Sequence, residues 1–146
     1  MRSPESPDPK ADLGKHQFTY SLLPHTGDWK NGVTQAGMEL NVPLSAAVTD
    51  AHSGPIDSSH SFMSVDKSNV IIDTVKQAED SEDTIVRIYE SIGARGPVTL
   101  TFDREIAQAE ETNLLEETIN SMQPWFCQID FDIKPFEVKT FKIKFK

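Results

Sequence analysis

The sequence predicts an all-β fold, in which residues 59–146 form a small antiparallel β-sandwich and residues 1–58 precede it with one strand and one short helix. Two observations predict this class. From Phe62 onward, short stretches that alternate between apolar and polar residues recur at regular spacing and are separated by turn-forming residues. No helical periodicity of useful length interrupts them. One apolar and one polar face per strand is typical of antiparallel sheets that pack on one side.

The sandwich segment contains seven candidate strands. Residues 98–103 alternate strictly between apolar and polar side chains, and residues 127–133 do the same. Such alternation places the apolar residues of each strand on one face, toward a core. The candidates are Phe62–Val65, Asn69–Gln77, Thr84–Glu90, Val98–Asp103, Ala107–Thr112, Phe126–Ile133 and Phe136–Phe145.

The last candidate strand changes phase along its length. Phe136 and Val138 stand at even positions, whereas the apolar residues from Phe141 to Phe145 stand at odd ones. A slip of one residue sends every side chain to the opposite face, and a β-bulge supplies such a residue. We therefore predict a bulge near Lys139–Thr140. The alternatives are a strand buried on both faces at its midpoint and a strand that crosses between sheets.

The first segment predicts one strand and one helix between two connections. Residues His16–Leu23 alternate and predict the strand. The helix is predicted over residues 29–41, with Asp28 as its N-cap and Pro43 just beyond its end. Residues 1–13, with their prolines, predict an extended linker, and residues 45–61 predict a connection. The apolar stripe of the helix consists of Trp29, Val33, Ala36 and Leu40.

Charge and composition exclude several partners. The net charge of −9 disfavours binding to a nucleic-acid backbone. No apolar run approaches the ~20 residues that span a bilayer, so no membrane partner is expected. The start of the chain has no apolar signal-peptide core, and Cys127 is the single cysteine, which together predict a cytoplasmic location. Five lysines between Lys134 and Lys146 fit either an anion site or a strand facing acidic neighbours, and the alternating pattern favours the strand.

The residue types that bind metals lack usable spacing. Zinc sites on helices need two histidines four residues apart, or Cys and His pairs at short spacing. Cys127 is in phase with Ile129 and Phe131, which predicts a small buried apolar residue rather than a nucleophile. The four histidines are expected to be structural or at the surface: His16, His25, His52 and His60.

Paired carboxylates occur, but their context does not indicate catalysis. Glycosidases need two acids about 5–10 Å apart across a sugar. Asp130 and Asp132 fall on the polar side of their strand, and the pairs Glu110–Glu111 and Glu116–Glu117 lie in turn-like sequence without an aromatic residue to stack a sugar. Residues 93–96 (GARG) predict a hairpin turn rather than a phosphate cradle, because no helix follows. No catalytic, cofactor-binding or metal-binding residue is predicted.

Three blocks of sequence occur together in one order and span nearly the whole chain. The first block is Arg2–Pro4, Pro7–Pro9 and Asp12–His25 with Gly27–Trp29 and Asn41–Leu44. The second is Asp73–Asp80 with Val86–Glu90 and Gly93–Gly96, and the third is Glu111–Glu116 with Lys134–Phe141. Together these blocks resemble the carboxyl-terminal region of the α-mannosidases of glycoside hydrolase family 38, most closely the bacterial and cytosolic members.

The resemblance implies a non-catalytic role. It implies that residues 1–58 are the tail of a large β-supersandwich and that residues 59–146 are a terminal Ig-like sandwich. The family is a retaining, zinc-dependent glycosidase whose zinc and nucleophilic aspartate lie in an amino-terminal domain, so no such residue is carried over. The chain is then expected to have no cofactor and no activity alone, and to pack against the remaining domains of a parent enzyme that handles carbohydrate and can form a homo-oligomer.

Two other functions remain open from the sequence. A carbohydrate-binding module would display exposed aromatic residues, for which Trp29 and Trp125 are the tryptophan candidates. A free-standing interaction protein would require Met1 to be the true start, whereas the family's chain continues upstream of this position.

Overall fold

The computed structural model describes residues 6, 8–10 and 13–146, so much of the predicted linker, residues 1–13, lies outside the described residues. The chain divides into two compact units, Met1–Leu44 and Ser45–Lys146. Residues 45–61 contain no helix or strand, as expected for a connection. The predicted domain boundary at residue 59 stays a prediction.

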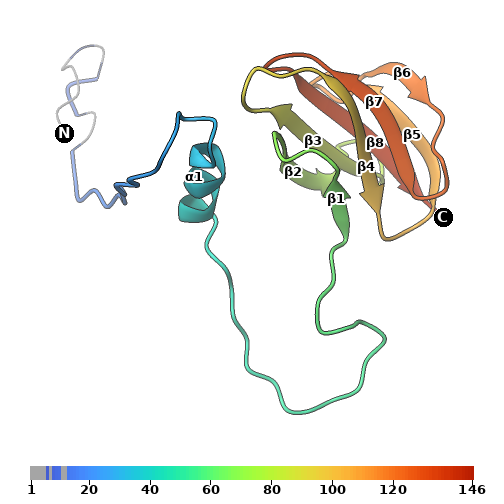
Figure 1. The fold of residues 1–146 in the computed structure, drawn as a ribbon, viewed down its shortest axis with the longest axis horizontal. Helices are drawn as coiled ribbons and strands as arrows, with labels where there is room; N and C mark the ends of the chain where they lie inside the picture. The colour runs from blue at the N-terminus through green and yellow to red at the C-terminus, as the bar shows by residue number, and fades with distance from the viewer. Residues whose placement is uncertain (1–5, 7, 11–12) are drawn as a thin grey trace. The chain divides into compact units, whose positions relative to one another are not determined.

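The second unit is a sandwich of two antiparallel sheets, which confirms the all-β prediction (Figure 1). A three-stranded sheet has the order β1-β4-β7, and a five-stranded sheet has the order β2-β3-β8-β5-β6. The strands are β1 (Met63–Val65), β2 (Val70–Gln77), β3 (Thr84–Glu90), β4 (Gly96–Phe102), β5 (Ile106–Thr112), β6 (Thr118–Met122), β7 (Gln128–Ile133) and β8 (Val138–Phe145).

The core lies between the inner faces of the two sheets. Leu100 and Ile129 are paired neighbours on β4 and β7 and are at most 1% exposed. The five-stranded sheet contributes fully buried apolar residues from β3 and β8, and the ring of Phe141 lies 4.7 Å from that of Phe131 on the opposite sheet. Since each such burial stabilises the fold by roughly 1.5–3 kcal/mol, this interior holds the sandwich together.

The seven candidate strands all appear, with ends shifted by up to two residues, and β6 was not predicted. Four of the five residues of β6 are exposed, and it pairs only with β5. An edge strand without a buried face leaves no apolar alternation in the sequence, which is why the pattern missed it.

The predicted bulge near Lys139–Thr140 is wrong. The register of β8 with β3 runs without a shift from Val138 to Ile143. Phe136 instead lies in a left-handed turn before the strand, with φ 56°, and Val138 faces out and is 51% exposed. Thr140 and Phe141 are both buried, so β8 is covered on both faces at its midpoint, which was the first alternative.

The first unit contains one helix, α1 (Val33–Asn41), and no strand among its described residues. The predicted strand His16–Leu23 is therefore wrong for this chain: the segment pairs with no other strand, and its apolar side chains are exposed, with Leu22 at 91%. A strand is stable only when its backbone pairs with a neighbour. None of the helices in the described residues is long and apolar enough to cross a membrane.

The helix starts later than predicted, and Asp28 is not its N-cap. Gly32 precedes Val33 with φ 81°, a left-handed conformation that no α-helical residue adopts, so residues 29–32 form a turn. The Asp28 carboxylate accepts a hydrogen bond from the Lys30 amide within that turn. The helix ends at Asn41, before Pro43, as predicted.

Candidate functional site

Glu90 is the buried charged residue of the sandwich, and it organises one end of the fold. It closes β3, where it continues the inward phase of Val86 and Ile88, and it is 1% exposed. An ionised carboxylate in such a position must be fully hydrogen-bonded, because burial without partners is costly.

Four hydrogen bonds surround the Glu90 carboxylate. Its Oε1 accepts from Asn69 Nδ2 at 2.9 Å and from the Ile92 amide at 3.0 Å. Its Oε2 accepts from the Gly93 amide at 2.7 Å and from the Phe136 amide at 2.9 Å. One side chain thus joins the start of β2, the β3–β4 connection and the β7–β8 turn.

The pKa of Glu90 reflects this environment. Burial by itself would raise the pKa, but the hydrogen bonds, with that from the Phe136 amide as the largest, outweigh it and lower the pKa to about 2 from 4.5. The carboxylate is therefore ionised at neutral pH, which suits a structural anion and not a general acid.

The turn at residues 93–96 differs from its prediction. It is not a hairpin, because β3 and β4 belong to different sheets. Gly93 has φ 79°, and its amide does bind an anion, but this anion is the Glu90 carboxylate of the same chain. A side chain at Gly93 would approach the Phe136 ring to 2.9 Å. The sequence held one indication of this site: Glu90 stands at an inward-facing position of its strand, three residues before Gly93.

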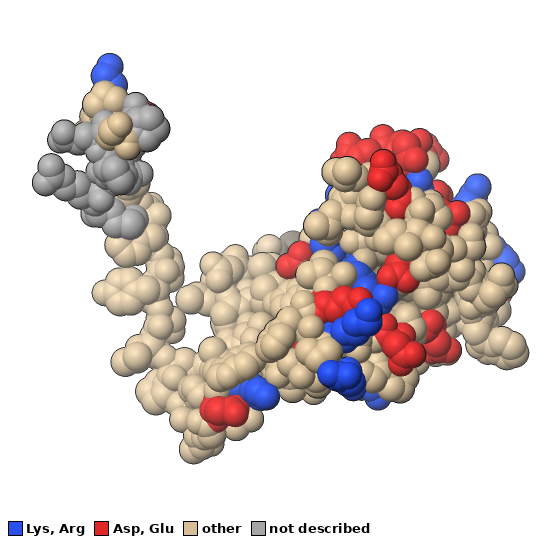
Figure 2. Space-filling model, turned by 90° about the horizontal axis from the view of Figure 1, so that it is seen from above, with Lys and Arg blue, Asp and Glu red and all other residues tan. Residues whose placement is uncertain are grey.

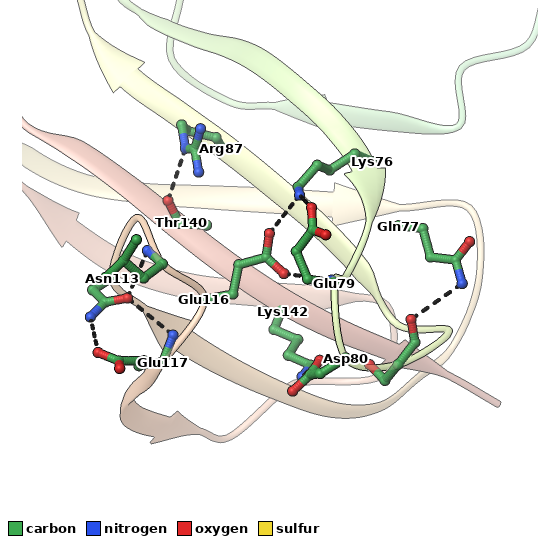
Figure 3. Close-up of polar contacts among 12 residues, drawn as sticks. Lys76, Gln77, Glu79, Asp80, Arg87, Asn113, Glu116, Glu117, Thr140 and Lys142 are labelled. Carbon is green, nitrogen blue, oxygen red and sulfur yellow. Dashed lines mark hydrogen bonds and ion pairs between the residues drawn. The ribbon is translucent and has the colours of Figure 1, made fainter.

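A second polar cluster lies on the outer face of the five-stranded sheet, where Lys76, Glu79 and Glu116 meet (Figure 3). Glu116 belongs to the β5–β6 loop, and its carboxylate lies 2.7 Å from Lys76 Nζ on β2, the opposite edge of the sheet. Its other oxygen accepts from the Glu79 amide at 2.8 Å. The hydrogen bond from the Lys76 ammonium is the largest cause that lowers the pKa of Glu116, and the hydrogen bond from the Glu79 amide is the second. The Glu116 side chain is 7% exposed, so the cluster ties two loops together.

The other predicted carboxylate pairs are also separated into individual contacts. Glu110 and Glu111 are consecutive residues of β5, and Glu111 lies 2.5 Å from Lys139. Glu117 accepts from Asn113 at 2.7 Å. Asp130 and Asp132 are exposed on β7, as predicted.

Three of the five lysines near the end of the chain, Lys139, Lys142 and Lys146, pair with acidic neighbours, as expected for a strand that faces acidic residues. Lys142 lies 2.5 Å from Asp80, and Lys146 lies 2.6 Å from Glu105. The Asp80 carboxylate, by its hydrogen bond, raises the pKa of Lys142. Acidic and basic side chains intermingle on the face shown in Figure 2.

Three of the histidines make individual hydrogen bonds within their own part of the chain. His60 bonds Asp103 at 2.9 Å, whereas His25 and His52 contact neighbouring backbone carbonyls. Cys127 is only half-buried, in the turn before β7, so the prediction of a buried residue is wrong. Across residues 6, 8–10 and 13–146, no group of three or more His, Cys, Asp or Glu side chains is placed to hold a metal ion.

These features define the second unit as a β-sandwich domain in which Glu90, Lys76 and Glu116 hold loops of the same chain together. A family model described as the glycosyl hydrolases family 38 C-terminal beta sandwich domain matches residues 69–141, half of the chain. The chain belongs to this family. The prediction that it corresponds to the carboxyl-terminal region of a family 38 α-mannosidase is confirmed.

The individual relatives that this chain matches are named as alpha-mannosidases. Alpha-mannosidase G of Dictyostelium discoideum is 39% identical over 97% of this chain, and alpha-mannosidase 2C1 of Homo sapiens is 39% identical over 80% of it. An alpha-mannosidase of Saccharomyces cerevisiae is 24% identical over 99% of the chain. The chain spans only 14%, 11% and 15% of the lengths of these three relatives.

Proposed function

We propose that this chain works as the non-catalytic carboxyl-terminal sandwich of an α-mannosidase, and that it stabilises the remainder of that enzyme by packing against it. The parent enzyme is a retaining, zinc-dependent hydrolase of α-mannosides in the cytoplasm, with its metal and catalytic carboxylate outside this chain. Family membership and the names of the relatives support the proposal.

One observation carries the packing role: the first unit exposes apolar side chains in a pattern that needs a partner. Phe18, Tyr20 and Leu22 are 67%, 86% and 91% exposed and alternate along an extended segment. Their alternation is that of a strand with one apolar face, which is stable only against another sheet. Helix α1 likewise contains no buried residue. The larger part of the enzyme would supply these surfaces.

Deletion and activity measurements test this role. The purified 146-residue chain should not hydrolyse an aryl α-mannoside, and it should not retain zinc after dialysis. A stop codon in the native gene that removes everything from residue 16 onward should abolish most of the soluble α-mannosidase activity, because the enzyme loses the apolar surfaces of residues 18–22 and of helix α1 together with the sandwich. A truncated enzyme that remains soluble and fully active would contradict the stabilising role.

A further inference from the structure

The turn that leads into β7 is held rigidly by the sandwich. The Trp125 amide donates to the Gln128 carbonyl at 2.9 Å, and the Gln128 amide donates back to the Trp125 carbonyl at 2.9 Å. The carbonyls of Phe126 and Cys127, between them, accept from the amides of Ile106 and Phe102 at 2.8 and 2.9 Å. Every peptide of this turn is thus fixed, either within the turn or to the β4–β5 segment.

The two large aromatic residues of this turn face out. Trp125 is 79% exposed and Phe126 is 65% exposed. Phe126 also has φ 55°, a left-handed conformation that is unfavourable for a bulky residue and natural for glycine. Glycine would therefore suit the fold of this turn better than phenylalanine. Phe136 has the same backbone conformation, but its amide binds Glu90 and its ring lies beside Gly93. The exposed ring of Phe126 has no such explanation in these contacts, which points to a role outside the folding of the sandwich.

A third exposed aromatic residue lies at the same end, where the chain enters the sandwich. Phe62 is 60% exposed, and its carbonyl accepts from the Asp103 amide at 3.0 Å. Asp103 and Ile106 are three residues apart, so the contacts of Phe62 and Phe126 with the β4–β5 segment are separated by about 10 Å at most. We call Phe62, Trp125 and Phe126 the aromatic end of the sandwich.

We infer that the aromatic end is a docking surface for the preceding, larger part of the same α-mannosidase polypeptide. This inference rests on the proposed function. Tryptophan and phenylalanine are enriched at the buried centres of protein interfaces, and a rigid turn loses little freedom on binding.

Two observations select this occupant. The match covers only 14% of alpha-mannosidase G, so most of that relative's polypeptide lies outside the matched region. The chain enters the sandwich at Phe62, beside the turn, so the upstream polypeptide is covalently joined to this end and meets it at a higher effective concentration than a separate molecule would. A second copy of the sandwich would lack this tether and would bring together two chains of net charge −9.

Oxidative footprinting with mass spectrometry tests the surface directly. Trp125 should oxidise rapidly in the isolated 146-residue chain and about tenfold or more slowly in the intact enzyme, because the centre of a stable interface excludes water. Phe136 is the control, because its ring is also exposed and its backbone is also left-handed, but it lies beyond the other end of β7. The rate at which Phe136 is oxidised should be the same in the isolated chain and in the intact enzyme.

A substitution separates docking from folding. In the isolated chain, Phe126→Gly should leave the Tm unchanged or raise it, because glycine relieves the disfavoured backbone. In the intact enzyme, the same substitution should lower the Tm and shorten the half-life of activity at elevated temperature. Phe136→Gly is the matched variant, and it should shift the Tm of the chain and of the enzyme in the same direction.

The remaining outcomes overturn the inference in distinguishable ways. Equal oxidation of Trp125 in the chain and in an intact, active enzyme would remove the docking surface and leave the proposed function standing. Slower oxidation of Trp125 in the isolated chain upon addition of mannose oligosaccharides would show a glycan contact instead. A native polypeptide of 16.3 kDa would remove both the proposed function and this occupant.

Discussion

Replacing Glu90 by glutamine keeps the size of the side chain and removes its negative charge, and the structure gives the cost in two ways. The pKa of Glu90 falls from 4.5 to about 2, which corresponds to roughly 3 kcal/mol of stability at neutral pH. Glutamine also offers one acceptor oxygen where Glu90 offers two. Its NH₂ group would face two backbone amide donors, and each buried donor left unpaired costs about 1–3 kcal/mol.

The pH dependence of this effect has a definite sign. Because the pKa of Glu90 is lower in the folded state than in the unfolded state, its contribution is fully present above about pH 4.5 and is lost as the pH falls toward 2. The difference in the free energy of unfolding between the wild type and Glu90→Gln should therefore shrink across this range.

Urea unfolding followed by circular dichroism measures both effects. At pH 7, Glu90→Gln should lower the free energy of unfolding by about 3 kcal/mol or more without changing the urea dependence. Glu82→Gln, at an exposed glutamate, should change it by less than about 0.5 kcal/mol. A Glu90→Gln chain as stable as the wild type at pH 7 would refute the structural role of this carboxylate.

The same geometry gives three further predictions. Gly93→Ala should lower the Tm, because the added methyl group would meet the Phe136 ring and the backbone has φ 79°; an unchanged Tm in a thermal scan would contradict the close contact. Glu116→Gln should increase amide hydrogen exchange in residues 113–117. In the wild type the same loosening of the loop should appear as the pH falls below the ordinary range for glutamate, because Lys76 lowers the pKa of Glu116. Exchange that is insensitive to both changes would mean that the ion pair does not hold the loop. Limited proteolysis should cut first before residue 16 or within residues 46–60 and should leave a stable fragment that begins near His60; equal resistance of both halves would show one cooperative domain.

The sandwich could be predicted from the sequence because its strands bury one face each. The alternation in β4 and β7 comes from Leu100 and Ile129 facing the core, and it identified both strands. Edge strand β6 has no comparable buried apolar face, so its sequence shows no alternation of apolar and polar residues that would predict it. The segment His16–Leu23 alternates like a strand but pairs with no other strand here. Alternation shows that one face of a segment is apolar, but it does not show that a neighbouring strand is present to pair with it.

The carboxylate site was not predicted, although one indication of it stood in the sequence. Glu90 stood in phase with Val86 and Ile88, so its inward position was visible in the sequence, but its donors were not. The Phe136 amide comes from 46 residues away in the chain. The sequence likewise could not show that the apolar side chain of Val138 faces outward. The change from even to odd apolar positions along the strand therefore suggested a bulge, which the unbroken register of β8 excludes.

The size of the native polypeptide tests the central claim most directly. An antibody against the folded sandwich would capture the protein from an extract of its source, followed by mass measurement and an aryl α-mannosidase assay of the captured and remaining material. We predict a polypeptide several times heavier than 16.3 kDa and depletion of α-mannosidase activity from the extract. A captured chain of 16.3 kDa, with the activity left in the supernatant, would contradict the claim.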